Sequence, residues 1–547
     1  MAATLPRAQQ AFRDGDFAQA ERLLKRVLLT EPRSTGANEL MAYILGNRGD
    51  VEGAHRLLEI ATSAPDASRE SWYYLGKYFQ QRGDHAPAVA AFSRAIALDA
   101  NFFEALHDLG ASQAEQGEAE AALASFDRAL AVQPRSLEAL YNRGRALDAL
   151  WRFEAAVECY DRALAVNPGH VESWTNRGGA LLDLARYEEA LASFDRAIAL
   201  SPSHVEAWSG RGVTLHALRR HAEAMAAYDE ALRIRPGDRE VLARQFYAHA
   251  RLGEFEKAWP LFEHRWVEIG PLRHSQIPEW RGRESIKGKR VLTWCEQGFG
   301  DTLQYCRYVE RLEREGAEVV LEVQEPLRRL MAHSFPGRSV VSSGMALPSC
   351  DLQVPLMSLP LAFDSRLETI PMRVPYLSVD AESVDLWRAR IAPAKRGFNV
   401  GIACSGNPRQ RQNALRGIAL EKFSGLAAYA DLFLIQKDIP CADADWLRAN
   451  DASVRTFPDT LGDFNDSAAL VECMDLVICT DTSLAHLAGA LGKPAWLLLS
   501  WESDWRWLLD RDDSPWYPTL RLFRRDRFES ADALMTRVRA ALADRRR

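Results

Sequence analysis

Residues 475–500 (DLVICTDTSLAHLAGALGKPAWLLLS) combine hydroxyl, carboxylate and imidazole side chains in a pattern typical of an anion-binding helix N-terminus. An apolar run over 476–479 reads as a buried parallel strand, and a second run over 495–499 reads as the next strand. The helix expected over 484–491 follows several residues that favour helix caps. Its free N–H groups then lie at the carboxyl edge of the sheet, where they attract negative charge. The candidate caps include Asp481, Thr482 and Ser483, and His486 lies in the first turn, on the ligand side if the cap is Thr482 or Ser483.

The bulk composition of the chain narrows the partners that such a site serves. Its 547 residues predict two to four domains, and the net charge of −7 gives no support for a nucleic-acid partner. No apolar run approaches the ~20 residues of a membrane span, and the N-terminus lacks a signal-peptide pattern. The eight cysteines form no CxxC pair, so neither a zinc site nor a disulfide framework is indicated. We therefore expect a cytoplasmic protein with no transmembrane segment.

The first half of the sequence repeats with a period of 34 residues. Columns of similar residues keep one register over several repeats. The columns are Trp72, Leu106, Leu140, Trp174, Trp208 and Leu242; Gly76, Gly110, Gly144, Gly178 and Gly212; Ala88, Ala122, Ala156, Ala190, Ala224 and Ala258; Phe92, Phe126, Tyr160, Phe194, Tyr228 and Phe262; and Ala95, Ala129, Ala163, Ala197 and Ala231. The pattern resembles tetratricopeptide repeats, so it predicts an α-solenoid of about seven to eight helical repeats with a concave groove.

The groove predicted for this solenoid is a candidate docking surface for a protein or peptide. Asn142 and Asn176 follow the large-residue column by two positions, on the first helix of each repeat, which lines the inner surface in this architecture. A ladder of asparagine and arginine side chains there would clamp a peptide backbone. The alternative is that these residues form an ordinary solvated face of the scaffold.

Beyond the repeats the sequence alternates between strand and helix patterns. The predicted strands cover 290–295, 318–323, 339–342, 351–355, 399–404, 432–436, 453–457, 476–479 and 495–499. Two successive α/β modules of this kind predict two Rossmann-like lobes, with ligands at the carboxyl ends of the strands. The predicted domains are a tetratricopeptide array over 1–270, a linker over 271–288, an N-terminal lobe over 289–385, a C-terminal lobe over 386–530, and a final helix and tail over 531–547.

Four segments of the second half resemble the heptosyltransferase-like glycosyltransferases of family 9, which have the GT-B fold. The most specific is 481–494 (DTSLAHLAGALGKP), which is similar to that family's D-[ST]-x-x-x-H-x-x-x-A-x-G-x-P pattern. The others are 291–301 (VLTWCEQGFGD), 400–408 (VGIACSGNP) and 433–438 (FLIQKD). The resemblance implies an α-solenoid followed by an α/β GT-B fold of two Rossmann-like lobes. It also implies that the N-terminal lobe takes the acceptor and the C-terminal lobe takes a nucleotide-sugar donor.

The resemblance implies roles for single residues as well. Asp301, in the family's Gly-Asp loop, is the implied general base, although the same side chain is also placed to cap the following helix. Lys437, at a strand end, is the implied countercharge for a diphosphate leaving group, or else an ordinary surface lysine. His486 is either a donor-pocket residue or a buried histidine. The other implied donor contacts are Ser405, Gly406, Asn407, Arg416, Asp481, Thr482 and Ser483.

These patterns together predict a metal-independent glycosyltransferase that moves a sugar from a nucleotide-diphosphate donor to a protein or glycan hydroxyl. The repeats would recruit the acceptor. GT-B enzymes supply positive potential with helix dipoles and side chains, so no metal or other cofactor is expected, and the acidic run 510–513 reads as solvated. One alternative is a tetratricopeptide adaptor with a catalytically weakened transferase-like domain, because Cys404 and the 410–416 segment depart from the family pattern. A nucleotide-sugar epimerase is a third possibility.

Overall fold

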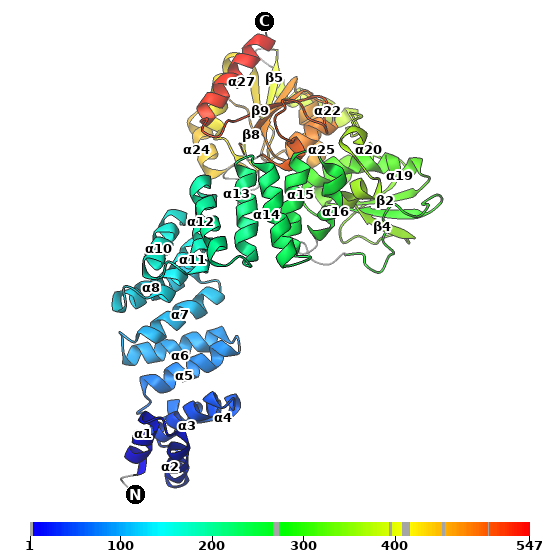
Figure 1. The fold of residues 1–547 in the computed structure, drawn as a ribbon. Coiled ribbons are helices and arrows are strands. Elements are labelled where there is room, and N and C mark those ends of the chain that lie inside the picture. Colours follow the sequence, from blue (N-terminus) through cyan, green and yellow to red (C-terminus); the bar gives the residue numbers. More distant parts are fainter. Residues whose placement is uncertain are drawn as a thin grey trace. The chain divides into compact units, whose positions relative to one another are not determined.

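The computed structural model describes residues 4–265, 273–392, 397–406, 416–450, 454–501 and 503–546. Contacts within the chain divide it into two compact units, Met1–Arg235 and Pro236–Arg547. The described part of the first unit is built from helices, and the second contains two parallel sheets with helices around them (Figure 1). No helix among the described residues is long and apolar enough to span a membrane.

The first unit is a stack of helix pairs, which confirms the predicted α-solenoid. The helices are α1 (Thr4–Arg13), α2 (Phe17–Thr30), α3 (Thr35–Asn47), α4 (Val51–Thr62), α5 (Arg69–Gln81), α6 (His85–Leu98), α7 (Phe103–Glu115), α8 (Ala119–Val132), α9 (Leu137–Ala149), α10 (Phe153–Val166), α11 (Val171–Asp183), α12 (Tyr187–Leu200), α13 (Val205–Ala217) and α14 (His221–Ile234). The glycine column lies against the aromatic column of the paired helix. A Cβ built at Gly144 would lie 2.5 Å from the ring of Tyr160, so only glycine permits this approach.

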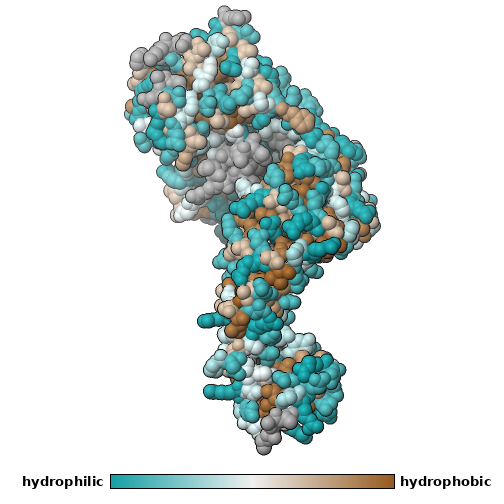
Figure 2. Space-filling view, turned by 90° about the vertical axis from the view of Figure 1, so that its left-hand side faces the viewer, coloured by the Kyte–Doolittle hydropathy of each residue, from teal (hydrophilic) through white to brown (hydrophobic). Residues whose placement is uncertain are grey.

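The surface of the array is mostly hydrophilic, with hydrophobic patches over the repeats (Figure 2). Exposed aliphatic residues recur near the ends of the second helices, and four of them keep one register: Leu98, Val132, Val166 and Leu200. Their spacing of 34 residues follows the repeat. The exposure of these four residues therefore follows from the repeat register and not from one local segment.

The last repeat belongs to the second compact unit. Its helices are α15 (Arg239–Arg251) and α16 (Phe255–Phe262), followed by the 3-10 turn η1 (Glu263–Arg265). Their apolar residues share one hydrophobic core with both α/β lobes. The repeat register therefore continues past the boundary between the two units.

The N-terminal lobe is a four-stranded parallel sheet of order β3-β2-β1-β4. Its elements are β1 (Arg290–Trp294), α18 (Phe299–Tyr305), η2 (Cys306–Tyr308), α19 (Val309–Arg314), β2 (Glu318–Val323), α20 (Glu325–Ser334), β3 (Ser339–Ser342), β4 (Leu352–Pro355), η3 (Leu356–Ser358), α21 (Leu359–Ala362) and η4 (Leu367–Thr369). The apolar strands are buried on both faces, as parallel sheets require.

The C-terminal lobe is a five-stranded parallel sheet of order β6-β5-β7-β8-β9. Its elements are α22 (Ala381–Ile391), β5 (Asn399–Ala403), η5 (Leu420–Ala428), β6 (Asp431–Leu434), α24 (Cys441–Ala449), α25 (Phe464–Glu472), β7 (Leu476–Thr480), α26 (Ser483–Ala490), β8 (Ala495–Leu499), η6 (Trp505–Trp507), β9 (Leu520–Arg524) and α27 (Ala531–Arg545). The two lobes confirm the predicted α/β organisation of two Rossmann-like lobes.

Two strand predictions differ from the structure. Residue 453 of the predicted strand 453–457 lies outside the described residues, and residues 454–457 form a single bridge, between Arg455 and Phe433, because Pro458 follows closely and leaves too little chain for a ladder. Strand β9 was not predicted. Its charged residues Arg521 and Arg524 interrupt the apolar run, which an edge strand tolerates because one side of it faces solvent.

Candidate functional site

In the sheet of the C-terminal lobe, the strand order reverses between β5 and β7. These two strands lie side by side although β6 separates them in sequence. Ala403 pairs with Cys479, so residues 404–406 and 480–483 leave the sheet at the same edge. Ligands of open α/β sheets bind at such switch points. Among the predicted donor contacts, Ser405, Gly406, Asp481, Thr482 and Ser483 are brought together at this edge.

The 404–406 loop is fixed by the buried side chain of Gln436. Gln436 Oε1 accepts hydrogen bonds from the backbone N–H groups of Cys404 and Ser405, at 2.8 and 3.2 Å. Its Nε2 donates to Ser405 Oγ at 3.0 Å. The sequence prediction chose the neighbouring Lys437 and missed Gln436. A polar residue at the end of a buried apolar run was the signal that would have found it.

Asp481 and Thr482 carry buried polar atoms without a hydrogen-bond partner among the described residues, namely Asp481 Oδ2 and Thr482 Oγ1. Arg416 Nη1 lies 3.7 Å from Asp481 Oδ2. Burial raises the pKa of Asp481 to about 6, against the opposing charge of Arg416. An unsatisfied buried polar atom costs free energy, so a ligand with hydrogen-bonding groups fits this edge.

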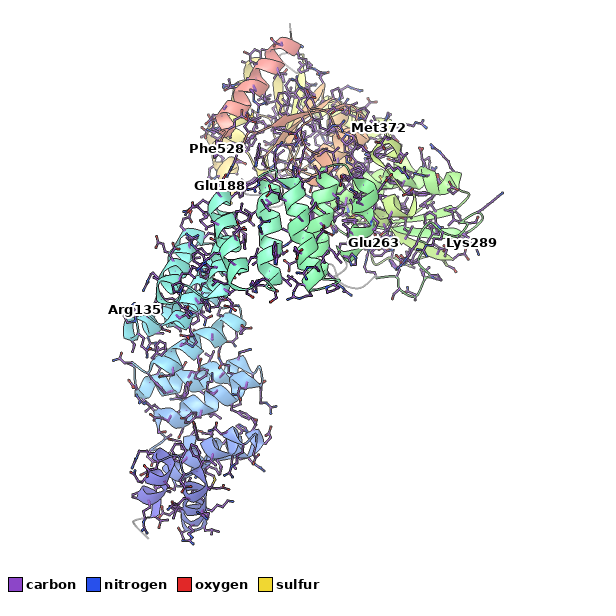
Figure 3. The ribbon with its side chains drawn as sticks, in the orientation of Figure 1. Arg135, Glu188, Glu263, Lys289, Met372 and Phe528 are labelled. Atoms are coloured by element: carbon purple, nitrogen blue, oxygen red, sulfur yellow. The ribbon has the colours of Figure 1, made fainter. Side chains whose placement is uncertain are left out.

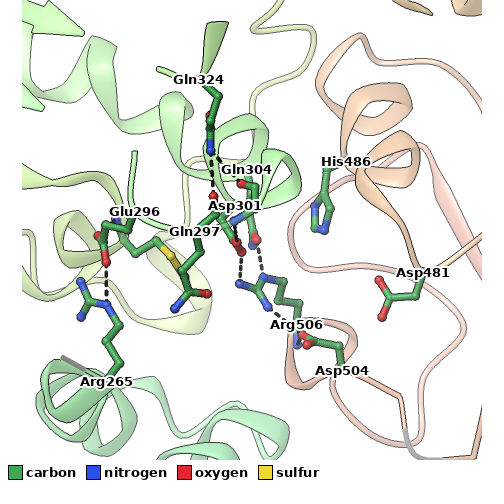
Figure 4. Close-up of polar contacts among 12 residues, drawn as sticks. Arg265, Glu296, Gln297, Asp301, Gln304, Gln324, Asp481, His486, Asp504 and Arg506 are labelled. Carbon is green, nitrogen blue, oxygen red and sulfur yellow. Dashed lines mark hydrogen bonds and ion pairs between the residues drawn. The ribbon is translucent and has the colours of Figure 1, made fainter. Parts of the chain in front are cut away.

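A line of charged side chains crosses from this edge to the N-terminal lobe (Figure 4). Arg506 donates from Nη2 to Asp301 Oδ1 at 2.5 Å, from Nη1 to Asp504 Oδ1 at 2.9 Å, and from Nε to Gln304 Oε1 at 2.6 Å. Arg416 Nη2 lies 3.7 Å from Asp504 Oδ2. Although burial acts to raise the pKa of Asp504, Arg506 and Arg416 hold it below its ordinary value. Both lobes therefore contribute to one charged cluster.

Asp301 is the third residue of α18, and its two oxygens have different partners. Asp301 Oδ2 accepts a hydrogen bond from the backbone N–H of Gly298 at 3.0 Å, so the side chain does cap the helix. Asp301 Oδ1 accepts from Arg506 in the other lobe. Burial raises the pKa of Asp301 above its ordinary value, although Arg506 opposes the shift. A raised pKa strengthens a carboxylate as a base, so capping and base catalysis remain compatible.

His486 is buried where the two lobes meet. Its Nδ1 lies 2.9 Å from Tyr517 Oη, and its ring stacks on Trp507 with centroids 5.3 Å apart. A Cβ built at Gly300 of α18 would lie 2.9 Å from His486 Cδ2, so α18 and α26 are in direct contact. Burial lowers the pKa of His486 to about 3, with Arg506 acting in the same direction. The imidazole is therefore neutral at physiological pH and offers a phosphate no positive charge.

Two other predicted residues are not joined to this cluster by any contact that the structure describes. Lys437 is exposed, and its Nζ donates a hydrogen bond to Gly462 O at 3.3 Å. Asn407 lies outside the described part of the chain. Arg416 is the first described residue after Gly406. It contacts the cluster through Asp481 and Asp504.

The two asparagines predicted to clamp a partner link neighbouring repeats. Asn142 Nδ2 lies 3.0 Å from His107 Nε2, and Asn176 Nδ2 donates to Tyr141 Oη at 3.2 Å. Both contacts join residues 35 apart, so they occupy equivalent places in successive repeats. They form part of a polar ladder along the array.

Asp504, Arg506 and Gln304 were not among the predicted site residues. Asp504 and Arg506 belong to the segment 501–510 (WESDWRWLLD), in which charged residues stand between tryptophans. The available signal was that charged residues alternate with large apolar residues in this segment. The structure buries most of those apolar residues. Gln304 offered no such signal, since its partner Arg506 lies 202 residues away.

No group of three or more metal-ligating side chains occurs among the residues that the structure describes. In the acidic run 510–513, Arg511 forms an ion pair with Asp513 at 2.6 Å.

Comparisons with known proteins match both halves of the chain. A tetratricopeptide repeat model matches residues 39–101, 107–152, 149–203 and 179–239. A model described as glycosyltransferase family 9 (heptosyltransferase) matches residues 454–498, which include β7, α26 and the Asp481–His486 cluster residues. The chain joins tetratricopeptide repeats to a glycosyltransferase family 9 domain. The family 9 match covers the β7–α26 side of the switch-point edge, and residues 404–406 lie outside it.

Among curated proteins, the chain is similar to Protein FlbA of Caulobacter vibrioides, with 25% identity over 339 residues. The match covers 56% of this chain and 56% of FlbA, so the chain spans only about half the length of this relative.

Solved structures with similar repeats cover the array only in part. YrrB, described as a tetratricopeptide protein with an unusual peptide-binding site, is 21% identical, with a TM-score of 0.31 over 34% of this chain and 97% of YrrB. The C-terminal part of a repeat protein from Cytophaga hutchinsonii is 16% identical, with a TM-score of 0.37 over 44% of this chain and 98% of that chain. TTC0263 from Thermus thermophilus is 26% identical, with a TM-score of 0.28 over 33% of this chain and 98% of TTC0263.

Proposed function

We propose that the protein is a glycosyltransferase that moves a sugar from a nucleotide-diphosphate donor to a hydroxyl group of a protein or glycan. The donor binds at the carboxyl edge of the C-terminal lobe, the acceptor binds at the N-terminal lobe, and the repeats recruit the acceptor. The cytoplasm is the proposed compartment, since all eight cysteines are free thiols.

The observation that carries this proposal is the pair of unsatisfied polar atoms at the switch point, Asp481 Oδ2 and Thr482 Oγ1. Both lie inside the family 9 match, and Arg416 Nη1 lies 3.7 Å from Asp481 Oδ2. A donor sugar or ribose supplies hydroxyl groups that would satisfy both atoms. The cost of leaving them unsatisfied is then recovered when the donor binds.

The proposed chemistry uses side chains from both lobes. Asp301 takes the proton of the acceptor hydroxyl. At the same time the hydroxyl oxygen attacks the anomeric carbon of the donor sugar, and the bond from that carbon to the diphosphate breaks. The electron pair leaves with the diphosphate oxygen. The guanidinium groups of Arg416 and Arg506, the N-terminus of α26 and Lys437 are the candidates that stabilise this negative charge. No metal or other cofactor is required in this scheme.

For the acceptor we propose an extended segment of a protein in the groove of the array. The support is the ladder of polar contacts that includes Asn142 and Asn176, whose amides lie at equivalent places in successive repeats. Amide side chains at a constant spacing suit the repeating N–H and C=O groups of a peptide backbone.

The test is a donor panel with the full-length protein. UDP-, GDP- and ADP-sugars are added, with CMP-sugars as a monophosphate comparison, and thermal shift and donor hydrolysis are measured. We expect one donor class to raise Tm and to be hydrolysed slowly. Thr482→Val should weaken that binding. Thr519→Val is the matched control, because Thr519 Oγ1 is also buried without a partner but lies just before β9, at the amino edge of the same sheet. Absence of binding by every donor would reject the transferase.

A second candidate function is a tetratricopeptide adaptor with weakened activity. It is favoured by one observation: both oxygens of Asp301 already accept hydrogen bonds, from Gly298 and Arg506. An adaptor would bind an acceptor protein through the array but show no turnover with any donor. Donor binding without hydrolysis or transfer would support it.

A further inference from the structure

The helix pair of the last repeat contacts the turn that carries Asp504 and Arg506. Phe246, Phe255 and Trp259 pack against Trp505, with ring centroids 5.3, 6.0 and 5.6 Å away. Trp505 is almost fully buried and is the residue between Asp504 and Arg506. Its ring therefore anchors this charged turn to α15 and α16.

The same helix pair also contacts the loop that leads to Asp301. Arg265, at the end of η1, is 6% exposed and donates from Nε to Glu296 Oε2 at 2.8 Å. It also donates from Nη2 to Ser358 Oγ and from Nη1 to Glu263 Oε1, each at 2.8 Å. Figure 3 marks Glu263 beside the N-terminal lobe. Glu296 lies in the loop between β1 and α18, and Asp301 follows five residues later, in the first turn of α18.

Arg265 satisfies a carboxylate that burial would otherwise penalise. Burial raises the pKa of Glu296, and Arg265 together with the backbone N–H of Met357 opposes that rise. The Met357 N–H donates to Glu296 Oε1 at 3.1 Å. A lysine has one ammonium group and cannot reach Glu296, Ser358 and Glu263 in the fork geometry of a guanidinium. The loop conformation therefore depends on an arginine at this position.

We infer that Arg265 is a positioning residue of the transferase, and that the helix pair α15–α16 fixes Asp301 relative to Arg506. This inference rests on the proposed function for its catalytic consequence. The helix pair contacts the Asp301 loop through Arg265 and the Asp504–Arg506 turn through its aromatic residues. Repeat architecture thus forms part of the catalytic unit itself and does not only recruit the acceptor.

The consequence for catalysis is a change in turnover and not in donor binding. The proposed donor contacts lie on the C-terminal lobe, whereas Arg265 acts on the loop before Asp301. A shift of the base by about 1 Å is enough to slow a reaction by about 100-fold. Loss of Arg265 should therefore lower kcat by about 10- to 100-fold and leave the donor KM within about twofold.

Four variants of the full-length protein separate positioning from folding. Arg265→Met removes the fork but leaves the Glu296 carboxylate buried and uncompensated, which destabilises the fold by itself. Arg265→Met combined with Glu296→Gln removes both charges and keeps an acceptor for the Met357 N–H. Arg265→Lys keeps the charge without the fork. Arg338→Met is the matched control, because Arg338 makes a comparable two-pronged contact with Glu313 elsewhere in the N-terminal lobe.

Hydrogen exchange and steady-state kinetics are measured on all four. We expect the double variant and Arg265→Lys to exchange amides of residues 296–302 about tenfold faster than wild type, with other segments unchanged and with reduced kcat. Arg338→Met should leave both unchanged. Wild-type exchange and turnover in the double variant or in Arg265→Lys would overturn the inference, because charge compensation alone would then explain Arg265.

The exchange result also separates this inference from the proposed function. If the wild-type protein turns over no donor, the transferase proposal fails, and the exchange of residues 296–302 still decides whether Arg265 positions the loop. If the wild-type protein turns over a donor but the Arg265 variants keep wild-type exchange and kcat, only the inference fails.

Discussion

The buried carboxylate of Asp481 lowers the stability of the folded protein when it is charged. Its folded pKa of about 6 lies above that of an unfolded aspartate because burial disfavours the charge. The folded state therefore binds a proton more tightly than the unfolded state between about pH 4 and pH 6. Stability falls as pH rises through this window, and the loss is complete above it.

Asp481→Asn should make the ligand-free protein more stable. The amide avoids the buried charge, so the expected gain at pH 8 is about 2–3 kcal/mol and vanishes near pH 4. Denaturant unfolding of variant and wild type at both pH values measures the difference. Donor binding should weaken at the same time. A variant that loses stability at pH 8 would contradict the assignment of Asp481 as an unsatisfied buried acid.

Asp301→Asn tests the base without removing the helix cap. The asparagine Oδ1 can still accept from the Gly298 N–H, but the amide cannot take a proton and its NH2 group no longer accepts from Arg506. We expect turnover to fall by about 10²- to 10⁴-fold while the donor Kd stays constant. The pH profile of the wild type should rise with pH through the raised pKa of Asp301, since the deprotonated form is the active one. Unchanged turnover would assign the base elsewhere.

At the scale of single elements, the glycine column explains how two helices of a repeat approach each other. A Cβ on Gly178 would lie 2.8 Å from the ring of Phe194, whereas a Cβ on the adjacent Gly179 meets nothing within 4 Å. Both residues belong to α11, so they share the same helical backbone. One glycine is needed for packing, and the other only weakens the helix.

Gly178→Ala and Gly179→Ala should therefore shift the stability of the array in opposite directions. The first forces the ring of Phe194 to move and should cost about 1–3 kcal/mol. The second should stabilise by up to about 1 kcal/mol, because alanine is the better helix former. Chemical denaturation followed by helical circular dichroism measures both. Equal effects of the two substitutions would show that the packing contact does not set the glycine requirement.

The elements of this fold were predictable where the signal is local. The strand–helix–strand unit of β7, α26 and β8 follows directly from its apolar runs and small residues, and the repeats follow from their period. Contacts between distant segments were not predictable. Arg506 and Asp301 are 205 residues apart, and nothing near either residue specifies the other. The pairing exists only because α18 packs on the C-terminal lobe.

For the whole molecule, the contact boundary at Pro236 predicts which fragments fold. A fragment over Pro236–Arg547 keeps the aromatic contacts of Phe246, Phe255 and Trp259 with Trp505, so it should be soluble and unfold cooperatively. A fragment over 273–547 loses them and the Arg265–Glu296 ion pair, which exposes apolar surface. Expression, gel filtration and thermal unfolding of both fragments check this. Equal stability of the two would show that the last helix pair is dispensable.

The placement of the last repeat in the second unit also bears on how such proteins are recombined. A chimera that exchanges acceptor arrays between relatives should be joined between α14 and α15, so that the recipient keeps its own final helix pair. A junction placed where the repeat register ends would replace Arg265 and the partners of Trp505 together. Modularity in this chain therefore follows packing, and the sequence period runs one repeat beyond the exchangeable part.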